Sequence, residues 1–187
     1  MSTLKHEEGL QKLFANINDW LKFAEAKNFG LLSLNAAIVF GFTQINFADG
    51  SIISKAGFYV FSPLAILSFL SALLSLFPIL SQIEKGSYSK NWINWLSNFI
   101  DKEKKFENIH FYGYLKGINE DEFERKYLIK TNSADAFSQF EKELGTQILY
   151  NSRITWLKYQ LFKIGAFFFL VGIILFIISL LLFKCFT

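Results

Sequence analysis

The chain has 187 residues, of which 52% are hydrophobic and 19% are charged, and its formal net charge is +3. A lone cysteine, Cys185, argues against a disulfide framework and a cysteine metal site. Residues 84–163 carry thirteen basic and eleven acidic side chains, a balance that lacks the basic stripe of a nucleic-acid-binding protein. The long uncharged stretches are therefore the informative part of the composition.

Residues 1–27 are predicted to form an amphipathic helix, because apolar positions recur there at helical spacing and charged positions lie opposite. Four lysines and four acids in this arm, with no apolar core run, argue against a cleavable signal peptide. The apolar face lies either on a membrane surface or against other helices, and both interpretations stay open. This face comprises Leu10, Leu13, Phe14, Ile17, Trp20, Leu21 and Ala24.

Three uncharged stretches follow, at residues 28–48, 56–83 and 164–183. The last has 20 residues, sixteen of them Leu, Ile, Val or Phe, and about 20 apolar helical residues cross the roughly 30 Å core of a bilayer. The second is long enough to span with tilt. A soluble helical hairpin is the alternative for the first two stretches, because polar residues dilute the first one. These polar residues are Asn35, Thr43, Gln44 and Asn46.

The fold class expected from this pattern is an all-α integral membrane protein. It has an amphipathic N-terminal helix (1–27), three transmembrane helices and a helical cytoplasmic sensing segment (84–163) between the second and third spans. Four basic residues lie in the arm, one in the 49–55 hairpin, thirteen in the central segment and one in the tail. The positive-inside rule therefore places the N-terminus and the central segment in the cytoplasm.

Within the second span, Ala65, Ser68, Ala72 and Ser75 fall on one stripe that permits close helix–helix approach. The alternative is that serine is simply tolerated there. Next, Tyr88–Phe106 has tryptophans and lysines typical of an interfacial helix, or of a helix packed on the cytoplasmic bundle.

Residues 108–117 are aromatic and glycine-punctuated, which indicates a turn or a short extended stretch. Asn119, followed by three acids, is predicted to cap a helix, and Ser133 is a second N-cap candidate. A helix is then expected from Ala134 to Phe183, with Gly145 as the expected break if one exists.

Enzyme motifs are missing from the sequence. His6 and His110 lack partners at metal-ligand spacing, and no Walker loop, nucleophile elbow or Rossmann fingerprint occurs. We therefore expect a protein that is not an enzyme, with no catalytic residues, no metal and no cofactor.

Charged and polar residues gather instead just before the first and third spans, at the predicted cytoplasmic mouth of the bundle. Paired cations with a carboxylate and a tyrosine suit an anionic ligand such as a nucleotide phosphate. The alternative is that the lysines extend to lipid headgroups. These residues are Glu25, Lys27, Arg153, Lys158 and Tyr159, with Asn35 about two turns inside the first span.

Three segments carry a resemblance to a known family: EAKNFGLLSLN (25–35), HFYGYLKGINEDEF (110–123) and RITWLKYQLFKIGAFF (153–168). The first has an acid, a lysine two residues later and an asparagine eight residues past the lysine. The second is an aromatic–glycine stretch before an acidic helix start, and the third a Lys–Tyr pair entering the last span. In this order they resemble the Pycsar-type transmembrane effector domain of bacterial antiphage defence. The family more often has Asp at the position of Glu25.

The resemblance implies a multi-pass protein of the bacterial inner membrane that binds cyclic CMP or cyclic UMP made by a partner cyclase. Binding then perturbs the membrane, and the infected cell dies or stops growing. We expect a homo-oligomer with the lipid bilayer as its partner and no nucleic acid polymer. By the resemblance, the ligand-binding candidates are Glu25, Lys27, Asn35, Phe111, Gly113, Lys158 and Tyr159, and Arg153 joins them by position.

Other functions remain open from the sequence. One is a membrane-anchored scaffold for a protein partner, and another is a holin-like toxin that needs no ligand. An inhibited ion channel and a sensor for a different cyclic nucleotide are further alternatives.

Overall fold

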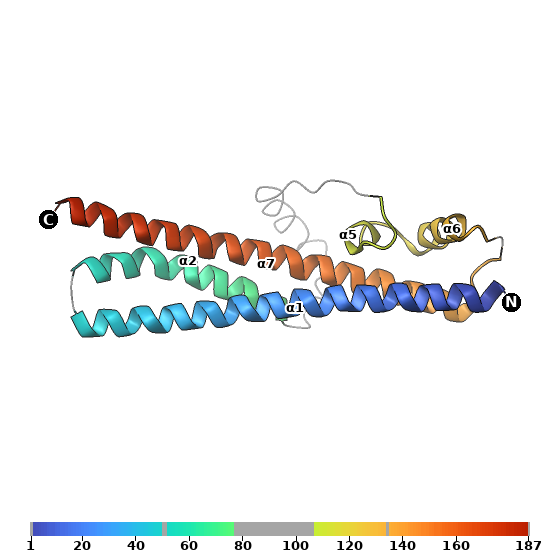
Figure 1. Ribbon diagram of the computed structural model, residues 1–187, viewed down its shortest axis with the longest axis horizontal. Coiled ribbons are helices and arrows are strands. Elements are labelled where there is room, and N and C mark those ends of the chain that lie inside the picture. Colours follow the sequence, from blue (N-terminus) through green and yellow to red (C-terminus); the bar gives the residue numbers. More distant parts are fainter. Residues whose placement is uncertain (1, 50–51, 77–106, 134, 187) are drawn as a thin grey trace. The chain divides into compact units, whose positions relative to one another are not determined.

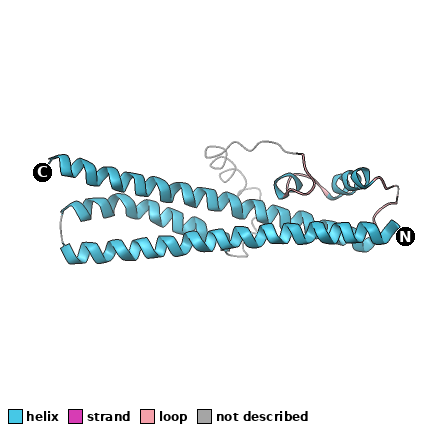
Figure 2. Ribbon diagram, in the orientation of Figure 1, coloured by secondary structure: helices cyan, strands magenta, loops and turns pink. Residues whose placement is uncertain are grey.

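The computed structural model describes residues 2–49, 52–76, 107–133 and 135–186, and every regular element in these ranges is an α-helix (Figures 1 and 2). At 1.5 Å per residue, the two longest helices, of 48 residues each, are each about 70 Å long. The predicted all-α fold class is thus confirmed for the described residues. The predicted helix Tyr88–Phe106 lies outside them. The helices are α1 (Ser2–Asp49), α2 (Ile52–Leu76), α5 (Tyr112–Leu115), α6 (Glu120–Thr131) and α7 (Gln139–Phe186).

The chain divides into two compact units. Unit 1 comprises Met1–Ala24 and Glu103–Tyr159, and unit 2 comprises Glu25–Lys102 and Gln160–Thr187. Helices α1 and α7 contribute residues to both units, whereas α5 and α6 belong to unit 1 and α2 to unit 2. Each unit has its own hydrophobic cluster.

Unit 1 buries large apolar side chains in its centre. The apolar face of the N-terminal arm packs into this core, which decides between the two interpretations left open by the sequence: the face contacts protein. Phe140 of α7, by contrast, is 53% exposed. Buried members of the core include Leu10, Leu13, Ile17, Leu115, Phe123, Leu144 and Ile148.

Local hydrogen bonds fix the ends of α6. The Asn119 side chain accepts from the backbone N–H of Glu122 at 2.8 Å, so the predicted N-cap is confirmed. At the other end Asn132 adopts the left-handed conformation (φ 56°), and its N–H donates to the carbonyl of Ile129. This is a usual helix stop, which asparagine tolerates well.

The predicted start of α7 is wrong, whereas its predicted continuity into the last apolar stretch is confirmed. The helix begins at Gln139, not after Ser133, because Ser138 and Glu141 cap it reciprocally: the Ser138 N–H donates to Glu141 Oε2 and the Glu141 N–H to Ser138 Oγ. Gly145, the expected break if one existed, does not interrupt the helix. A Cβ there would lie 3.2 Å from the Phe123 ring, so the glycine admits the ring of α6.

The 108–117 segment was expected to be a turn or extended. It contains the short helix α5 instead, closed by bonds such as Leu115 N–H to the carbonyl of Phe111.

Unit 2 packs α1, α2 and α7 through small and polar residues. The predicted stripe Ala65, Ser68, Ala72 and Ser75 is buried throughout, each residue at 1% exposure or less. Glycines on α7 allow the close approach, since a Cβ at Gly165 would lie 2.9 Å from Leu31 Cδ2 and one at Gly172 would lie 3.1 Å from Phe61 Cδ2. Ser71 Oγ also donates to the carbonyl of Leu161 at 2.7 Å.

The outward surface of unit 2 carries large apolar side chains. Among the described residues, one helical run, Gln139–Ser179, is long and apolar enough to cross a membrane, and Phe61–Ser75 is a shorter apolar helix. Exposed apolar residues on α2 and α7 include Ile66, Leu67, Leu70, Leu74, Leu170, Ile174, Ile177, Ile178 and Leu181.

Candidate functional site

The predicted site residues are divided between the units. Glu25, Lys27 and Asn35 belong to unit 2, whereas Phe111, Gly113, Arg153, Lys158 and Tyr159 belong to unit 1. Each set has a defined local structure, and the ligand-binding role of every member stays a prediction.

In unit 2, Asn35 is fully buried and links α1 to α2. Its Nδ2 donates to the carbonyl of Leu31 at 2.8 Å and to Ser68 Oγ at 2.9 Å. A buried amide is costly unless it is hydrogen-bonded, and this amide finds one of its acceptors on a neighbouring helix. Lys27 is half-buried, with its Nζ 5.5 Å from the centroid of the Phe162 ring on α7, and Glu25 is exposed.

Asn28 is a second fully buried asparagine of α1 that sequence reasoning missed. It precedes Asn35 by seven residues, or about two helical turns, so both side chains lie on one face. This spacing was the available signal. Together the two amides make the inward face of α1 in unit 2 polar.

In unit 1, Tyr159 of α7 stacks on Tyr112 of α5, with ring centroids 5.2 Å apart and planes 11° from parallel. Two aromatic side chains of α1 join them: Trp20 lies 5.7 Å from Tyr112 and 6.4 Å from Tyr159, and Phe23 lies 6.5 Å from Tyr159. Phe111 completes this aromatic cluster at 4.6 Å from Tyr112. Three chain segments thus meet at Tyr159.

Gly113 shapes the same place. A Cβ at this position would overlap the Phe111 ring, so the glycine lets the ring fold back over the first turn of α5. The structure therefore brings together Phe111, Gly113 and, through Tyr112, Tyr159. Sequence reasoning missed Tyr112, Trp20 and Phe23 as members of this cluster.

Hydrogen bonds hold the α5 segment on its neighbours in unit 1. Asn16 of α1 donates to the carbonyl of His110 at 3.1 Å, and Arg153 of α7 donates to the carbonyl of Ile118 at 3.4 Å. These bonds fix both ends of the segment that supplies Phe111 and Tyr112. Arg153 thereby has a structural role in addition to its predicted one.

Unit 1 also contains cationic side chains, on α6, on α7 and just after α5. Lys116 Nζ is 3.7 Å from the centroid of the Trp156 ring, a cation–π contact, and Lys158 is 93% buried. Lys126 binds the Tyr114 hydroxyl and Glu122, and these two hydrogen bonds raise the pKa of the lysine. Burial and the charge of Lys130 lower the pKa of His110. Aromatic faces and cations together suit a planar anionic ligand.

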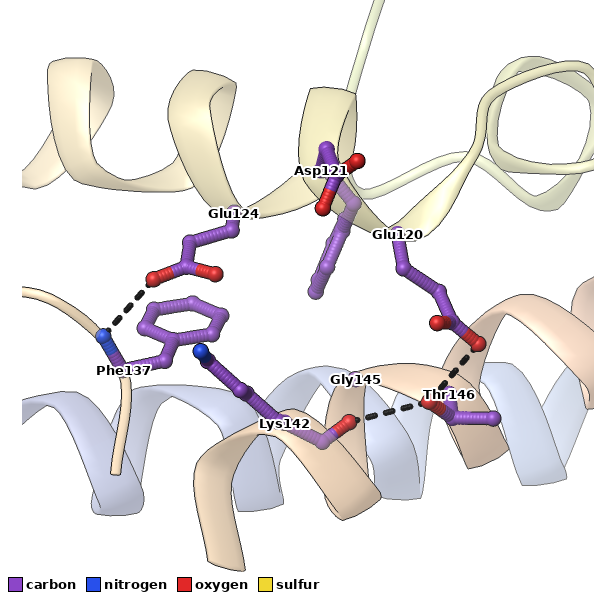
Figure 3. A pocket seen from close by; sticks show the side chains of 8 residues that line it. Glu120, Asp121, Glu124, Phe137, Lys142, Gly145 and Thr146 are labelled. Carbon is purple, nitrogen blue, oxygen red and sulfur yellow. Dashed lines mark hydrogen bonds between the residues drawn. The ribbon is translucent and has the colours of Figure 1, made fainter. Parts of the chain in front are cut away.

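A second feature of unit 1 is a small pocket between α6 and α7, shown in Figure 3. Its volume is about 90 Å³, below the roughly 300–1,000 Å³ of typical ligand pockets. Glu124 Oε1 accepts from the Phe137 N–H at 2.8 Å, and Glu120 Oε1 accepts from Thr146 Oγ1 at 2.9 Å. These carboxylates fasten α6 to α7. In the described ranges, no group of three or more His, Cys, Asp or Glu could hold a metal ion.

Comparison with known families assigns the chain. A family model described as the Pycsar effector protein domain matches residues 9–183, nearly the whole chain. Neither a curated protein nor a solved structure matches it. The apolar run Gln139–Ser179 agrees with the transmembrane character of that domain. The chain therefore belongs to the Pycsar effector protein domain family, a family of membrane effectors in antiphage defence.

Proposed function

We propose that this protein senses a cyclic pyrimidine nucleotide, cyclic CMP or cyclic UMP, with unit 1 and perturbs the bacterial inner membrane with unit 2. No chemical reaction is assigned to it, so it acts as a receptor and not as an enzyme. A partner cyclase supplies the nucleotide, and growth arrest or death of the infected cell follows. Family membership supports this proposal. The arrangement of side chains in each unit suggests how each part of the proposed function would work.

The observation that carries the proposal is the stacked pair Tyr112–Tyr159 with Trp20 and Phe23 around it. Tyr159 is the last residue of unit 1 on α7, and Phe23 is one residue from the end of unit 1 on α1. A base that stacks on or displaces these rings would change the contact between the two helices that continue into unit 2. Stacking of one base on an aromatic side chain contributes about 1–3 kcal/mol.

Basic residues of unit 1 supply the second element of recognition. The cyclic phosphate carries a negative charge, and Arg153, Lys158 and Lys116 are basic residues of unit 1 on the segments that supply the aromatic rings. Charge-assisted hydrogen bonds to phosphate are about twice as strong as neutral ones. Glu25, Lys27 and Asn35 remain predicted contributors from unit 2.

We place three helical segments of unit 2 in the membrane, with the N-terminus in the cytoplasm. Two features support this placement: polar Asn28, Asn35 and Ser68 face inward, and large apolar side chains face outward on α2 and α7. Lipid favours this arrangement, because a polar side chain there needs a protein partner. Differential affinity of the nucleotide for two arrangements of the helices would then drive membrane perturbation.

The test is dye release from liposomes that contain the full chain, with cyclic CMP, cyclic UMP, cyclic AMP and cyclic GMP added in turn. Release with one pyrimidine nucleotide alone is the expected result. Release without any nucleotide would instead identify a ligand-independent toxin. If none of the four nucleotides causes dye release although the protein is shown to be inserted in the liposomes, the result would favour a scaffold or a sensor for another second messenger.

Matched variants locate the site. Tyr159→Ala is expected to abolish nucleotide-dependent release, whereas Tyr150→Ala, an exposed tyrosine on the same helix, should leave it intact. Lys27→Ala and Lys158→Ala should likewise abolish release. Lys12→Ala is their control, since Lys12 is exposed and pairs with Glu8. Release that survives both Lys27→Ala and Lys158→Ala would remove these lysines from the site.

A further inference from the structure

The buried polar side chains that the structure describes in unit 2 all lie toward one end of its three helices. They occupy the first part of α1 in this unit, the last part of α2 and the first residue of unit 2 on α7. The other end buries apolar side chains such as Phe61 and Phe169. Among the described residues, the interior of unit 2 therefore changes from partly polar to apolar along its length. The buried polar residues are Asn28, Asn35, Ser68, Ser71, Ser75 and Gln160.

The polar residues of α1 and α2 form two levels. Asn35 Nδ2 donates to Ser68 Oγ at 2.9 Å, which sets the first level. Because only residues 50–51 separate the two helices, α1 and α2 run antiparallel. Seven residues bring a helix almost back to the same face, so Asn28, seven before Asn35, lies level with Ser75, seven after Ser68. The two polar levels, Asn35–Ser68 and Asn28–Ser75, are thus about 10 Å apart along the axis.

Two oxygen atoms at the polar levels have no hydrogen-bond partner among the described residues. They are Asn35 Oδ1 and Ser75 Oγ, and both side chains are fully buried. An unpaired polar atom is costly in an apolar interior, and lipid offers it no partner. Ser71 differs, because its Oγ donates to the carbonyl of Leu161 and so holds α2 on α7. Helix packing alone therefore accounts for Ser71 but not for the two unpaired oxygens.

An aromatic cluster fills the interior at the other end. The Phe61 ring is 1% exposed, and its centroid lies 6.4 Å from those of Phe169 and Phe176, with both pairs edge to face. Gly172 lets α7 approach this ring, since a Cβ there would lie 3.1 Å from Phe61 Cδ2. An apolar constriction of this kind stops water and ions without any charged barrier. Phe61, Phe169 and Phe176 are named the phenylalanine cluster below.

We propose that the two polar levels line the path by which ions and small solutes cross the membrane in the active state, and that the phenylalanine cluster keeps this path closed at rest. The inference rests on the proposed function and names the part of unit 2 that perturbs the membrane. A shift of α7 against α2 would part Phe61 from Phe169 and Phe176. Water that enters would then pair with Ser75 Oγ and Asn35 Oδ1, which favours the open arrangement.

The first test opens the path without any ligand. Phe61→Ser removes the central ring of the phenylalanine cluster, so potassium efflux from liposomes that contain the full chain should become several-fold faster in the absence of nucleotide. Phe61→Leu keeps a large apolar side chain and should stay closed. Phe69→Ser makes the same change at a 37% exposed position of α2 and should also stay closed.

Two results of this test overturn the proposal. One is a Phe61→Ser protein that inserts in the liposomes and leaks no faster than the unchanged protein. The other is equal leakage from the Phe61→Ser and Phe69→Ser proteins, because leakage would then follow from any loss of a phenylalanine ring on α2.

The second test measures whether water reaches the polar levels. In a Cys185→Ser background, Ser68→Cys and Ser75→Cys replace a hydroxyl by a thiol with little change in size. A water-soluble methanethiosulfonate should modify both thiols several-fold faster in the open protein, because the thiolate is the reacting form and needs water. The open protein is obtained with the nucleotide that causes release or with Phe61→Ser.

Neighbouring positions supply the controls. Leu67→Cys and Leu74→Cys lie at the same depths as the two serines but on the outward face of α2, where the native side chains are 45% and 47% exposed. We expect both controls to stay unmodified in the closed and the open protein. Modification at 68 and 75 that is equally slow in both states overturns the proposal, and so does modification of the controls at the rate of the serine positions.

The two proposals fail separately. A protein whose Phe61→Ser variant leaks and admits the reagent, but which no nucleotide opens, keeps the path and loses the proposed ligand. A protein that releases dye with a pyrimidine nucleotide, but whose positions 68 and 75 never become accessible, keeps the ligand and loses the path.

Discussion

The two units of this chain each have a hydrophobic cluster, but they differ in the largest side chains at their centres and on their surfaces. Unit 1 places Leu10, Phe123 and Ile148 inside, at 1% exposure or less, whereas unit 2 places Asn28 and Asn35 inside at 0%. On the outside, unit 2 carries many large apolar side chains on α2 and α7, such as Ile66 and Ile174, which are more than 50% exposed. The first pattern is that of a protein in water, and the second suits lipid.

Helices α1 and α7 each carry both patterns along one uninterrupted element. On α7, Ile148 in unit 1 is fully buried and Ile174 in unit 2 is 54% exposed. On α1, Leu10 is fully buried and Phe40 is 65% exposed. The α-helical backbone is therefore the same in both halves. The difference between the surroundings that the two halves suit lies in their side chains.

The largest effect is expected in the core of unit 1. Phe123→Ala should lower the free energy of unfolding by about 3–5 kcal/mol, since a buried aromatic side chain leaves a cavity. Phe140→Ala, at a 53% exposed site on α7, is the matched control and should cost far less. Pulse proteolysis of the full chain in lipid nanodiscs measures both. Equal losses would mean that unit 1 does not have the core described here.

The second-largest effect is expected from the same change, isoleucine to lysine, made at an exposed position of each unit. Ile174→Lys should raise the apparent free energy of membrane insertion of the last helix by about 2.5–3.5 kcal/mol, because it puts a charge near the middle of the apolar run. Ile129→Lys, at a 71% exposed isoleucine of α6, should leave insertion unchanged. A C-terminal reporter of membrane orientation gives the measurement. Insertion insensitive to Ile174→Lys would contradict lipid exposure of this face.

A smaller effect concerns the cap of α6. Asn119→Ala should destabilise unit 1 by about 1 kcal/mol because the Glu122 N–H loses its acceptor. Asn119→Ser supplies another oxygen and should recover most of that loss. The same proteolysis assay compares the two variants. Full stability in Asn119→Ala would show that the cap is dispensable.

The smallest effect is a pH dependence confined to unit 1. Because the pKa of His110 is lowered in the folded state, the unfolded chain binds more protons just below the usual pKa of 6.5. The contribution of His110 to stability is therefore complete above pH 6.5 and is lost as the pH falls through and below that value. His110→Gln keeps the backbone bonds of this residue and should flatten that part of the profile. An identical profile in the variant would assign the dependence to other groups.

Much of this architecture follows from sequence patterns that repeat over several turns. The apolar face of the arm, the buried stripe from Ala65 to Ser75 and the Asn119 cap were predicted and are confirmed. The predicted start of α7 was wrong because a single local hydrogen bond decides which of two nearby serines caps the helix. Ser138, not Ser133, caps α7, because Glu141 lies three residues beyond Ser138 and returns the bond.

The candidate site was harder to predict because its contacts are long-range. Tyr112 and Tyr159 are 47 residues apart, and no local periodicity signals that their rings stack. Gly145 illustrates the same limit: its reason for being glycine is the Phe123 ring, which lies 22 positions earlier in the chain. Asn28, by contrast, could have been found from its two-turn spacing to Asn35.

The most direct test of the central claim, that the two units occupy different solvents, is labelling of single cysteines with a membrane-impermeant maleimide. In a Cys185→Ser background, vesicles with the cytoplasmic face outward would carry Tyr150→Cys in unit 1, or Leu70→Cys or Ile174→Cys in unit 2. All three native side chains are at least 40% exposed. We predict rapid labelling at position 150 and none at positions 70 and 174, because a thiol in lipid neither ionises nor meets the reagent. Labelling at 70 and 174 as fast as at 150 would contradict the account.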